Sequence, residues 1–204
     1  MKCLDLFCGT KSFTKIAEKK GYECDTLDIL ESFNPTFCCD IMEWDYKQIP
    51  QGTYDIIWSS PNCKDYSKMN FICNKMDKDL TYSNNLIKRV LEIFEYFKPK
   101  YWFLENPQTG KLKDQEFMDF LPFQDVDYCK YGYDYRKRTR IWTNNILWNP
   151  RPLCRGNNKC DKIVNGRHVG FNHTAWNQKE RKLTNWEQRI SIPPQLIEEI
   201  IDSC

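Results

Sequence analysis

Short apolar runs alternate with amphipathic stretches through the first half of this chain. Runs of the length expected for buried strands occupy residues 3–7, 23–29, 38–41, 54–60 and 100–106. Helical spacing follows the first run, at Phe13, Ile16 and Ala17, and recurs over 83–97 with Ser83 as the expected N-cap. This alternation predicts an α/β fold with a doubly wound, mostly parallel sheet. Such sheets bind their ligands beyond the carboxyl ends of the strands.

The second half of the chain departs from this alternation. Residues 123–133 and 140–146 predict two further strands that pair with each other and give the sheet an antiparallel terminal strand. Residues 149–185 are rich in Asn, Gly, Pro, Arg and Lys and show little periodicity, which indicates a small irregular lobe. A last helix is expected from Pro194, and its apolar face consists of Leu196, Ile197, Ile200 and Ile201.

Charge is distributed unevenly along the chain. Residues 1–129 carry 16 Lys and Arg against 21 Asp and Glu, a net charge of −5, whereas residues 130–189 carry 14 against 4, a net charge of +10. A basic segment of this kind is typical of a surface that faces a polyanion such as nucleic acid. The alternative is a basic face that only contacts solvent.

The cysteines and the apolar pattern bear on location. The 11 cysteines are odd in number and irregularly spaced, and the chain begins directly in a strand-like run without a basic leader. No apolar stretch reaches the roughly 18 residues that a membrane span needs. We therefore expect reduced thiols and a cytoplasmic or other intracellular location.

The ends of the first three predicted strands carry carboxylates and a glycine turn. Asp5 and Gly9 flank the first turn, Asp28 ends the second strand, and Asp40 follows the third. A carboxylate at the end of the second strand is placed to bind the hydroxyls of a ribose. Because the turn lacks the full G-x-G-x-x-G pattern, it favours a nucleoside without a pyrophosphate. A single glycine turn is common among α/β proteins and does not identify the ligand.

A thiol and a second carboxylate follow the next two strands. Cys63 lies just beyond the strand at 54–60, and Glu105 lies at the end of the strand at 100–106. Neighbouring strands would bring them to one crevice, where Lys64 and the arginines of 136–140 are candidates for lowering the pKa of the thiol. The alternatives are an inert buried cysteine and a structural carboxylate.

Four segments, read in order, resemble the motifs of the cytosine-C5 DNA methyltransferases. They are "LDLFCGT", "SSPNCKDYS", "FLENP" and "RKRTRIW", and the short enzymes of phages and large DNA viruses are the most similar. The resemblance covers residues 2–148 and resumes at "RISIPPQLIEEI". It implies a Rossmann-like class I methyltransferase sheet in a catalytic domain at 1–148, completed by 186–204. The lobe at 149–185 would then recognise the target.

The resemblance also assigns roles to residues. Cys63 would be the nucleophile on C6 of a cytosine flipped out of DNA, Glu105 would hold N3 and N4, and Arg140 would contact O2 with Arg138 supporting the loop. S-adenosylmethionine would occupy a pocket formed by Asp5, Phe7, Gly9, Asp28, Asp40, Ile41 and Pro61. Thiolate addition at C6 makes C5 nucleophilic enough to accept a methyl group.

Two motifs depart from the common family pattern. Pro61-Asn62-Cys63-Lys64 stands where the family usually has "PPCQ", which puts the packing beside the target base in doubt. Lys11 and Ser12 occupy positions where glycines are frequent. The lobe at 149–185 is also short, so recognition of a very short site, or a need for a second subunit, is expected.

The lobe contains residues of the types that bind zinc. The candidates are Cys154, Cys160, His168 and His173. Their spacing matches no standard zinc finger, and cysteine is abundant throughout the chain. The sequence therefore predicts no metal, and these four are the candidates if one is bound.

Three other functions compete with a DNA cytosine-C5 methyltransferase. An exocyclic-amine methyltransferase would need no thiol, so it is distinguished by activity that survives loss of Cys63. A cytosine-C5 methyltransferase acting on RNA such as tRNA uses the same thiolate chemistry. A catalytically silent nucleic-acid-binding protein would bind DNA in a salt-sensitive way without taking up the cofactor.

Overall fold

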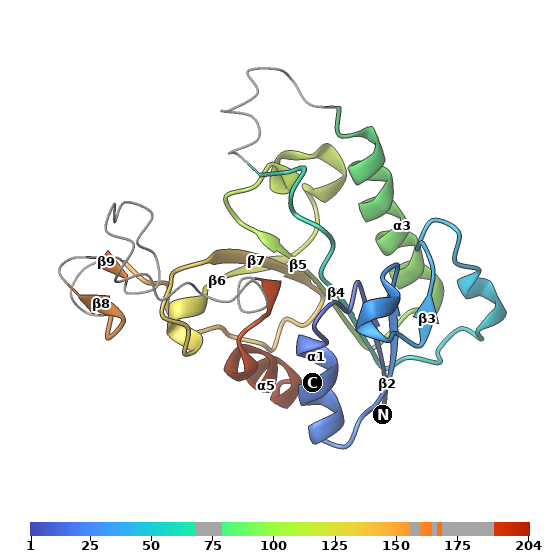
Figure 1. Ribbon diagram of the computed structural model, residues 1–204, viewed down its shortest axis with the longest axis horizontal. Coiled ribbons are helices and arrows are strands. Elements are labelled where there is room, and N and C mark those ends of the chain that lie inside the picture. Colours follow the sequence, from blue (N-terminus) through green and yellow to red (C-terminus); the bar gives the residue numbers. More distant parts are fainter. Residues whose placement is uncertain (68–78, 156–159, 165–166, 169–189) are drawn as a thin grey trace.

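Seven strands form a single sheet in the order β3-β2-β1-β4-β5-β7-β6 (Figure 1). The computed structural model describes residues 1–67, 79–155, 160–164, 167–168 and 190–204. The strands are β1 (Lys2–Leu6), β2 (Glu23–Asp28), β3 (Phe37–Cys38), β4 (Ile56–Ser59), β5 (Tyr101–Pro107), β6 (Phe123–Asp127) and β7 (Arg138–Thr143). The third strand is shorter than the predicted 38–41, and the sixth ends at Asp127 instead of reaching residue 133.

The pairing of the strands confirms the predicted fold class. β1, β2, β3, β4 and β5 pair in parallel, whereas β7 is antiparallel to both β5 and β6. The antiparallel strand is therefore the last strand of this sheet in the sequence, but it lies one position inside the edge. β6 and β7 pair with each other, as the sequence predicted.

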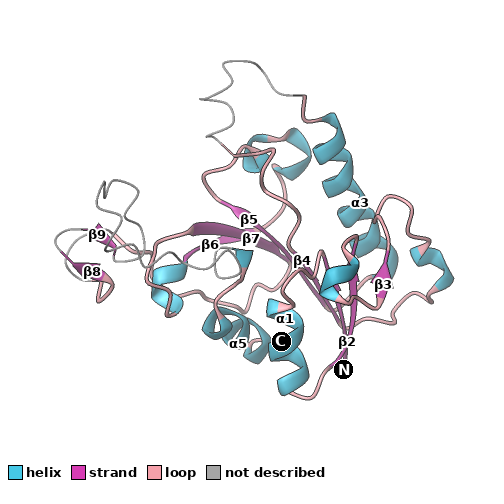
Figure 2. Ribbon diagram, in the orientation of Figure 1, coloured by secondary structure: helices cyan, strands magenta, loops and turns pink. Residues whose placement is uncertain are grey.

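Helices cover both faces of the sheet (Figure 2). On one face lie α1 (Ser12–Lys19) and α5 (Pro194–Asp202), which contact each other, and on the other lies α3 (Thr81–Phe97). Alternate residues of each strand enter different layers, as in β1, where Cys3 packs in the α1/α5 layer and Leu4 and Leu6 pack in the α3 layer. The predicted apolar face of α5 is buried, because Leu196, Ile197, Ile200 and Ile201 all belong to the α1/α5 layer.

The N-terminus of α3 differs from the sequence prediction. Ser83 lies inside the helix, and its hydroxyl donates a hydrogen bond to Asp65 Oδ2 at 2.6 Å instead of capping the helix. Asp79 accepts a hydrogen bond from the backbone N–H of Thr81 at 2.8 Å. The helix therefore starts two residues earlier, because an aspartate upstream supplies the acceptor that the first turn requires.

Short elements connect the strands. The 3₁₀ helices are η1 (Glu31–Phe33), η2 (Tyr46–Gln48), η3 (Leu112–Asp114), η4 (Glu116–Met118) and η5 (Tyr128–Tyr131). Within the predicted lobe, β8 (Ile163–Val164) and β9 (Arg167–His168) form a small antiparallel hairpin. In the ranges that the structure describes, no helix is both long and apolar enough to span a bilayer.

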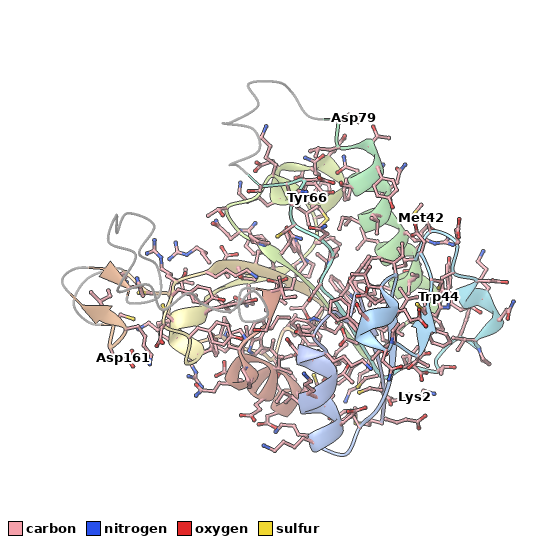
Figure 3. The ribbon with its side chains drawn as sticks, in the orientation of Figure 1. Lys2, Met42, Trp44, Tyr66, Asp79 and Asp161 are labelled. Carbon is pink, nitrogen blue, oxygen red and sulfur yellow. The ribbon has the colours of Figure 1, made fainter. Side chains whose placement is uncertain are left out.

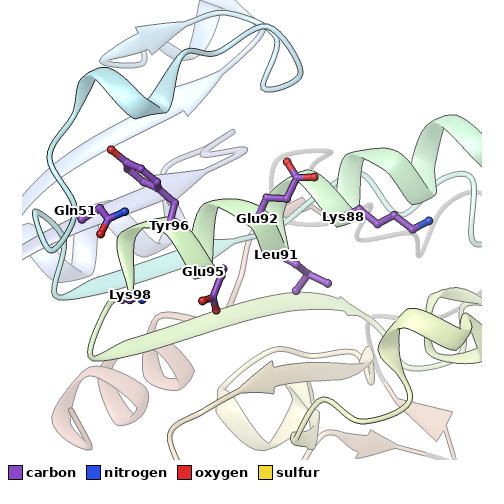
Figure 4. Close-up of a pocket in the computed structure, with 7 residues that line it drawn as sticks. All are labelled: Gln51, Lys88, Leu91, Glu92, Glu95, Tyr96 and Lys98. Atoms are coloured by element: carbon purple, nitrogen blue, oxygen red, sulfur yellow. The ribbon is translucent and has the colours of Figure 1, made fainter.

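A shallow groove of about 610 Å³ runs along the C-terminal half of α3 (Figure 4). Its lining comes from Gln51 and from α3 residues between Lys88 and Glu95, with Tyr96 and Lys98 at the end of the helix. None of the residues that the sequence singles out for chemistry lines it. The candidate functional residues lie elsewhere, at the carboxyl ends of the strands.

Candidate active site

The parallel register brings four strand ends to one edge of the sheet. Leu6 at the end of β1 pairs with Leu27 of β2 and with Ser59 of β4, and Ser59 pairs with Leu104 of β5. The turn after β1, the loop carrying Cys63 and the carboxylate of Glu105 therefore start at the same level. The sequence predicted this convergence from strand order alone.

The turn after β1 is held by the carboxylate of Asp28. Gly9 N donates to Asp28 Oδ2 at 3.0 Å, and Leu30 N donates to Oδ1 at the same distance. Phe7, Gly9 and Lys11 all have a positive φ, at 58°, 46° and 57°. A positive φ is energetically costly for Phe7 and Lys11, which are not glycines. The strained turn persists because β1 precedes it, α1 follows it, and Asp28 binds the amide of Gly9.

The carboxyl group of Asp5 is enclosed by other groups of the protein. It is buried, accepts a 2.6 Å hydrogen bond from the Thr14 hydroxyl, and so ties β1 to the first turn of α1. Burial raises the pKa of Asp5 to about 7, with the nearby Asp28 charge adding to the rise and the Thr14 hydrogen bonds opposing it. The structure thus buries this predicted cofactor residue between β1 and the start of α1.

The other predicted cofactor residues lie around the same edge. Asp40 is half-buried and accepts a hydrogen bond from Met42 N at 2.9 Å, while Ile41 and Pro61 are buried. Ile29, directly after Asp28, leaves 62% of its surface exposed, which is unusual for an isoleucine at a strand end. Ile29 was not among the predicted cofactor residues, although an apolar residue directly after the predicted ribose-binding carboxylate is a readable signal.

These residues suit a nucleoside sulfonium such as S-adenosylmethionine. Asp28 and Asp40 supply carboxylate oxygens for hydroxyl and amino groups, and Ile29 supplies an exposed apolar surface beside them. Each Asp28 oxygen receives one backbone hydrogen bond and retains a lone pair for a ligand. The backbone N–H of Gly9 donates to Asp28 and is therefore not free to bind a phosphate oxygen. This agrees with a ligand that carries no pyrophosphate.

The loop with Cys63 is fastened on both sides. Asn106 Nδ2 donates to the carbonyl of Pro61 at 3.2 Å, and the Asn62 side chain accepts from Lys64 N at 2.9 Å. Tyr66, which is buried beside the N-terminal part of α3, donates to Asn84 Oδ1 at 2.8 Å (Figure 3). The thiol is therefore presented on a fixed loop and is itself only partly buried.

Glu105 lies in a nearly closed environment with two polar neighbours. The residue as a whole is 5% exposed, and Oε1 accepts a 2.9 Å hydrogen bond from the hydroxyl of Tyr128. Lys137 Nζ lies 3.6 Å from the same oxygen and 5.0 Å from the centre of the Tyr128 ring. Burial and the negative charge of Glu105 raise the pKa of Tyr128 well above its ordinary value, so it stays a hydrogen-bond donor.

Cys63 and Glu105 interact electrostatically. Burial raises the pKa of the Cys63 thiol, the charge of Glu105 raises it further, and the ammonium of Lys137 lowers it. The sequence correctly placed the thiol beside the carboxylate. It was wrong about the cation, because Lys137 provides the lowering charge where Lys64 and the neighbouring arginines were expected.

Arg138 and Arg140 lie on the opposite face of the sheet from Glu105. Glu105 pairs directly with Ile141, so the alternation along β7 turns Arg138 and Arg140 toward the other layer. Arg138 forms a two-point ion pair with Asp127 at 3.1 and 2.8 Å. Arg140 does the same with Asp125 at 2.8 and 3.0 Å, and its guanidinium stacks 3.5 Å above the Phe123 ring. The structure does not bring either arginine to Glu105.

Sequence reasoning missed Lys137 and Tyr128. In "RKRTR", the period-2 alternation of a strand already separates Lys137 from Arg138 and Arg140, so this signal was available. Tyr128 offered no such signal, because its hydroxyl meets Glu105 only after β6, η5 and β7 have packed.

Among the zinc candidates, Cys154, Cys160 and His168 lie close together, and Cys129 joins them. The fourth predicted candidate, His173, lies outside the described residues.

Replacement of Lys137 by methionine is expected to make the Cys63 thiol less reactive at neutral pH. The Lys137 ammonium favours the thiolate, so its loss raises the pKa of Cys63 and moves the pH profile of alkylation to higher pH. The rate of iodoacetamide labelling at Cys63, followed by mass spectrometry across pH, measures the shift. Lys64→Met is the matched control, since Lys64 is exposed and is not among the charges that shift this thiol. A profile unchanged by Lys137→Met, or moved equally by Lys64→Met, would contradict the assignment.

Comparison with known proteins agrees with this geometry. The family model described as C-5 cytosine-specific DNA methylase matches residues 1–135. The whole chain is 34% identical, over 220 aligned residues, to the full length of the "Probable DNA (cytosine-5)-methyltransferase" of Frog virus 3 (isolate Goorha).

Two solved structures share the fold at low sequence identity. A DNA modification methyltransferase encoded within an E. coli prophage superposes with a TM-score of 0.55 at 13% identity, covering 76% of this chain and 52% of its own. The Dnmt2 methyltransferase of S. pombe gives a TM-score of 0.51 at 12% identity, covering 70% of this chain and 50% of its own. The chain thus spans about half the length of each. Because the family model matches about two-thirds of its residues and the viral relative aligns from end to end, this chain belongs to the C-5 cytosine-specific DNA methylase family.

Proposed function

We propose that this chain transfers a methyl group from S-adenosylmethionine to C5 of a flipped-out cytosine in DNA, with Cys63 as the nucleophile. The observation that carries the proposal is the placement of a partly exposed thiol and a nearly buried carboxylate at the ends of two neighbouring parallel strands, with one ammonium acting on both. This is the arrangement that thiolate addition to a pyrimidine requires.

Cys63 and Glu105 share the activation of the base. Addition of the Cys63 thiolate to C6 breaks the C5–C6 double bond, and a proton held between Glu105 and N3 of the ring turns the product into an enamine that is nucleophilic at C5. S-adenosylmethionine, when bound, would supply the methyl group that C5 accepts and would leave as S-adenosylhomocysteine, and N3 would return its proton to Glu105. Loss of the proton from C5 then expels the Cys63 sulfur and restores the C5–C6 double bond.

Tyr128 would orient the carboxyl group of Glu105, and Lys137 would favour the thiolate form of Cys63. The Tyr128 hydroxyl donates to Glu105 at 2.9 Å and keeps the carboxyl group in one orientation. Since burial and Glu105 raise the pKa of the thiol, the resting enzyme holds Cys63 mostly protonated. The protonated thiol resists oxidation in the free protein, whereas Lys137 opposes the rise in the pKa of Cys63 and favours the thiolate that attacks the base.

The proposed S-adenosylmethionine pocket lies at the carboxyl ends of the first strands. Asp28 would bind the ribose hydroxyls and Asp40 the adenine amino group, with Phe7, Gly9, Ile41 and Pro61 forming the walls. Ile29 would pack against the adenine with its exposed side chain. Asp5 would act indirectly, by holding the start of α1 through Thr14.

The arginines and the basic lobe would contact the nucleic acid. Arg140 would reach O2 of the base only by leaving Asp125 and by crossing from the face of the sheet opposite Glu105, while Arg138 would keep its pair with Asp127 and support the loop. Residues 149–185 would form the target-recognition lobe beside the catalytic domain formed by 1–148 and 186–204. A DNA substrate places this activity inside the cell, in the cytoplasm or, in a eukaryotic host, in the nucleus or a viral factory.

Trapping on 5-fluorocytosine tests the proposal. Fluorine at C5 cannot leave as a proton does, so the enzyme should remain bound to the base through Cys63 after methyl transfer. We expect a denaturant-resistant adduct with a fluorinated DNA duplex that depends on S-adenosylmethionine and maps to the peptide carrying Cys63. An unmodified duplex of the same sequence is the control and should leave no adduct. An adduct on matched RNA alone would replace the DNA substrate, and no adduct on either would favour a silent binding protein.

A further inference from the structure

Three cysteines and a histidine from distant parts of the chain meet beside the sheet. The thiols of Cys129, Cys154 and Cys160 and a ring nitrogen of His168 all lie within 4.8 Å of one another. The three cysteines are between 2% and 3% exposed, and Cys154 Sγ lies 3.5 Å from His168 Nε2. Cys129 belongs to η5 and His168 to β9, whereas Cys154 and Cys160 lie in the chain between β7 and β8.

Packing alone does not account for this cluster. The three cysteines form a small core of their own, and among the residues that the structure describes, only the partly buried Ile163 is an apolar residue packed against them. Three thiols bury little apolar surface, so they would stabilise the lobe weakly. A disulfide would use two of the sulfurs and leave the third thiol and the imidazole without a role.

We propose that these four side chains bind a structural zinc ion. A Cys₃His set is one of the standard tetrahedral zinc sites, and zinc–sulfur bonds of about 2.3 Å put the ligand atoms about 3.8 Å apart. The observed spacing therefore requires the ligands to approach by at most about 1 Å. Thiolate and imidazole ligands select zinc over magnesium or calcium, and an iron–sulfur cluster would ordinarily require a fourth cysteine.

The surroundings suit the charge of such a site. Zinc with three thiolates and a neutral imidazole carries a net charge of −1, which a nearby cation would stabilise. Arg138 Nη2 donates to the carbonyl of Cys154 at 3.3 Å, and Cys154 N donates to Asp127 Oδ2 at 2.9 Å. The Arg138–Asp127 pair thus holds the backbone of one ligand from both sides, in the outer shell that orients metal ligands.

The ion would fasten the basic lobe to the catalytic core. Cys129 directly follows Tyr128, whose hydroxyl donates to Glu105. A zinc ion bound by both Cys129 and His168 would therefore link the β8–β9 hairpin to the residue that follows Tyr128. The Tyr128 hydroxyl in turn orients the proposed catalytic carboxylate. A lobe of this size, with few apolar residues, needs such a link to keep one position relative to the flipped base.

Metal analysis of the full chain, purified under reducing conditions with zinc present, tests the proposal. We expect one equivalent of zinc per chain, released when the thiols are blocked by a mercurial reagent. Cobalt(II) in place of zinc should give the intense visible absorption of a tetrahedral thiolate site. Removal of the metal by a chelator should lower the melting temperature, and zinc should restore it.

Substitutions at the ligands give the sharper comparison. Cys129→Ser, Cys160→Ser and His168→Ala are each expected to weaken zinc binding by at least about 10-fold, the smallest loss usual for changes around a metal site. His168→Cys should retain the ion, because it substitutes one zinc ligand for another. Cys38→Ser is the matched control, since Cys38 is exposed and lies outside the cluster.

Several outcomes would overturn the zinc site. They are a wild-type chain that holds no zinc, cobalt absorption typical of an octahedral site, and ligand variants that keep the metal as well as Cys38→Ser does. If ligand variants fail to fold, the thiol count of the denatured wild type still decides. In a sample purified without added reductant, all 11 thiols should titrate once zinc is removed, whereas a loss of two would reveal a disulfide in place of the metal. None of these readouts depends on methyl transfer.

Discussion

Replacement of Cys63 by alanine is expected to abolish methyl transfer to DNA. Without the sulfur, no covalent adduct forms at C6, and C5 of cytosine remains too weak a nucleophile to accept a methyl group. Loss of a covalent nucleophile lowers turnover by roughly 10³-fold or more. Incorporation of a radiolabelled methyl group from S-adenosylmethionine into duplex DNA measures the effect.

The effect of Cys63→Ala should be confined to the chemical step. S-adenosylmethionine binding and the melting temperature should change little, because the thiol is partly exposed and the loop is held by Asn106 and Tyr66. Cys38→Ser, at an exposed cysteine, should retain full activity. Methyl transfer that survives Cys63→Ala would favour an enzyme that methylates an exocyclic amine, where no thiol is needed.

Replacement of Glu105 by glutamine is expected to lower turnover by about 10²- to 10⁴-fold, the usual contribution of a general acid or base. Glutamine keeps the shape of the side chain and can still accept the hydrogen bond from Tyr128. It cannot hold the proton that N3 of the ring needs as the thiolate adds. Single-turnover kinetics with saturating DNA and cofactor isolate this step from binding and product release.

Glu95→Gln provides the control for Glu105→Gln. Glu95 is an exposed carboxylate of α3, lies in the groove away from the strand ends, and should leave turnover unchanged. Folding of the Glu105 variant is checked by its melting temperature and by cofactor binding, both of which should stay near the wild-type values. Wild-type turnover in Glu105→Gln would show that the carboxylate serves only to position Tyr128 and Lys137.

The two variants also separate the proposed roles. Glu105→Gln removes a negative charge that raises the pKa of Cys63, so alkylation of the thiol should become faster at neutral pH while methyl transfer falls. A structural role for Glu105 would give no reason for these two rates to move in opposite directions.

Much of the fold was predictable because it depends on local patterns. Apolar runs and helical spacing located the strands and the helices. The alternation of the two predicted a mostly parallel sheet whose ligand-binding carboxyl ends lie on one edge. Errors occurred where a side chain some residues away decided the outcome. Asp79 set the start of α3 in place of Ser83, and β7 lies inside the sheet between β5 and β6.

The sequence alone indicated that Cys63 and Glu105 lie near each other, because Cys63 follows β4 and Glu105 belongs to the neighbouring parallel strand β5. Only the tertiary structure decided their neighbours. The register of β5 against β7 turned Lys137 toward Glu105 and sent Arg138 and Arg140 to Asp127 and Asp125 on the other face. Packing of η5 against the lobe brought Cys129, 25 residues before Cys154, into the thiol cluster. Local spacing encodes strand ends, whereas contacts between distant side chains depend on pairing across the sheet, which no short window of sequence contains.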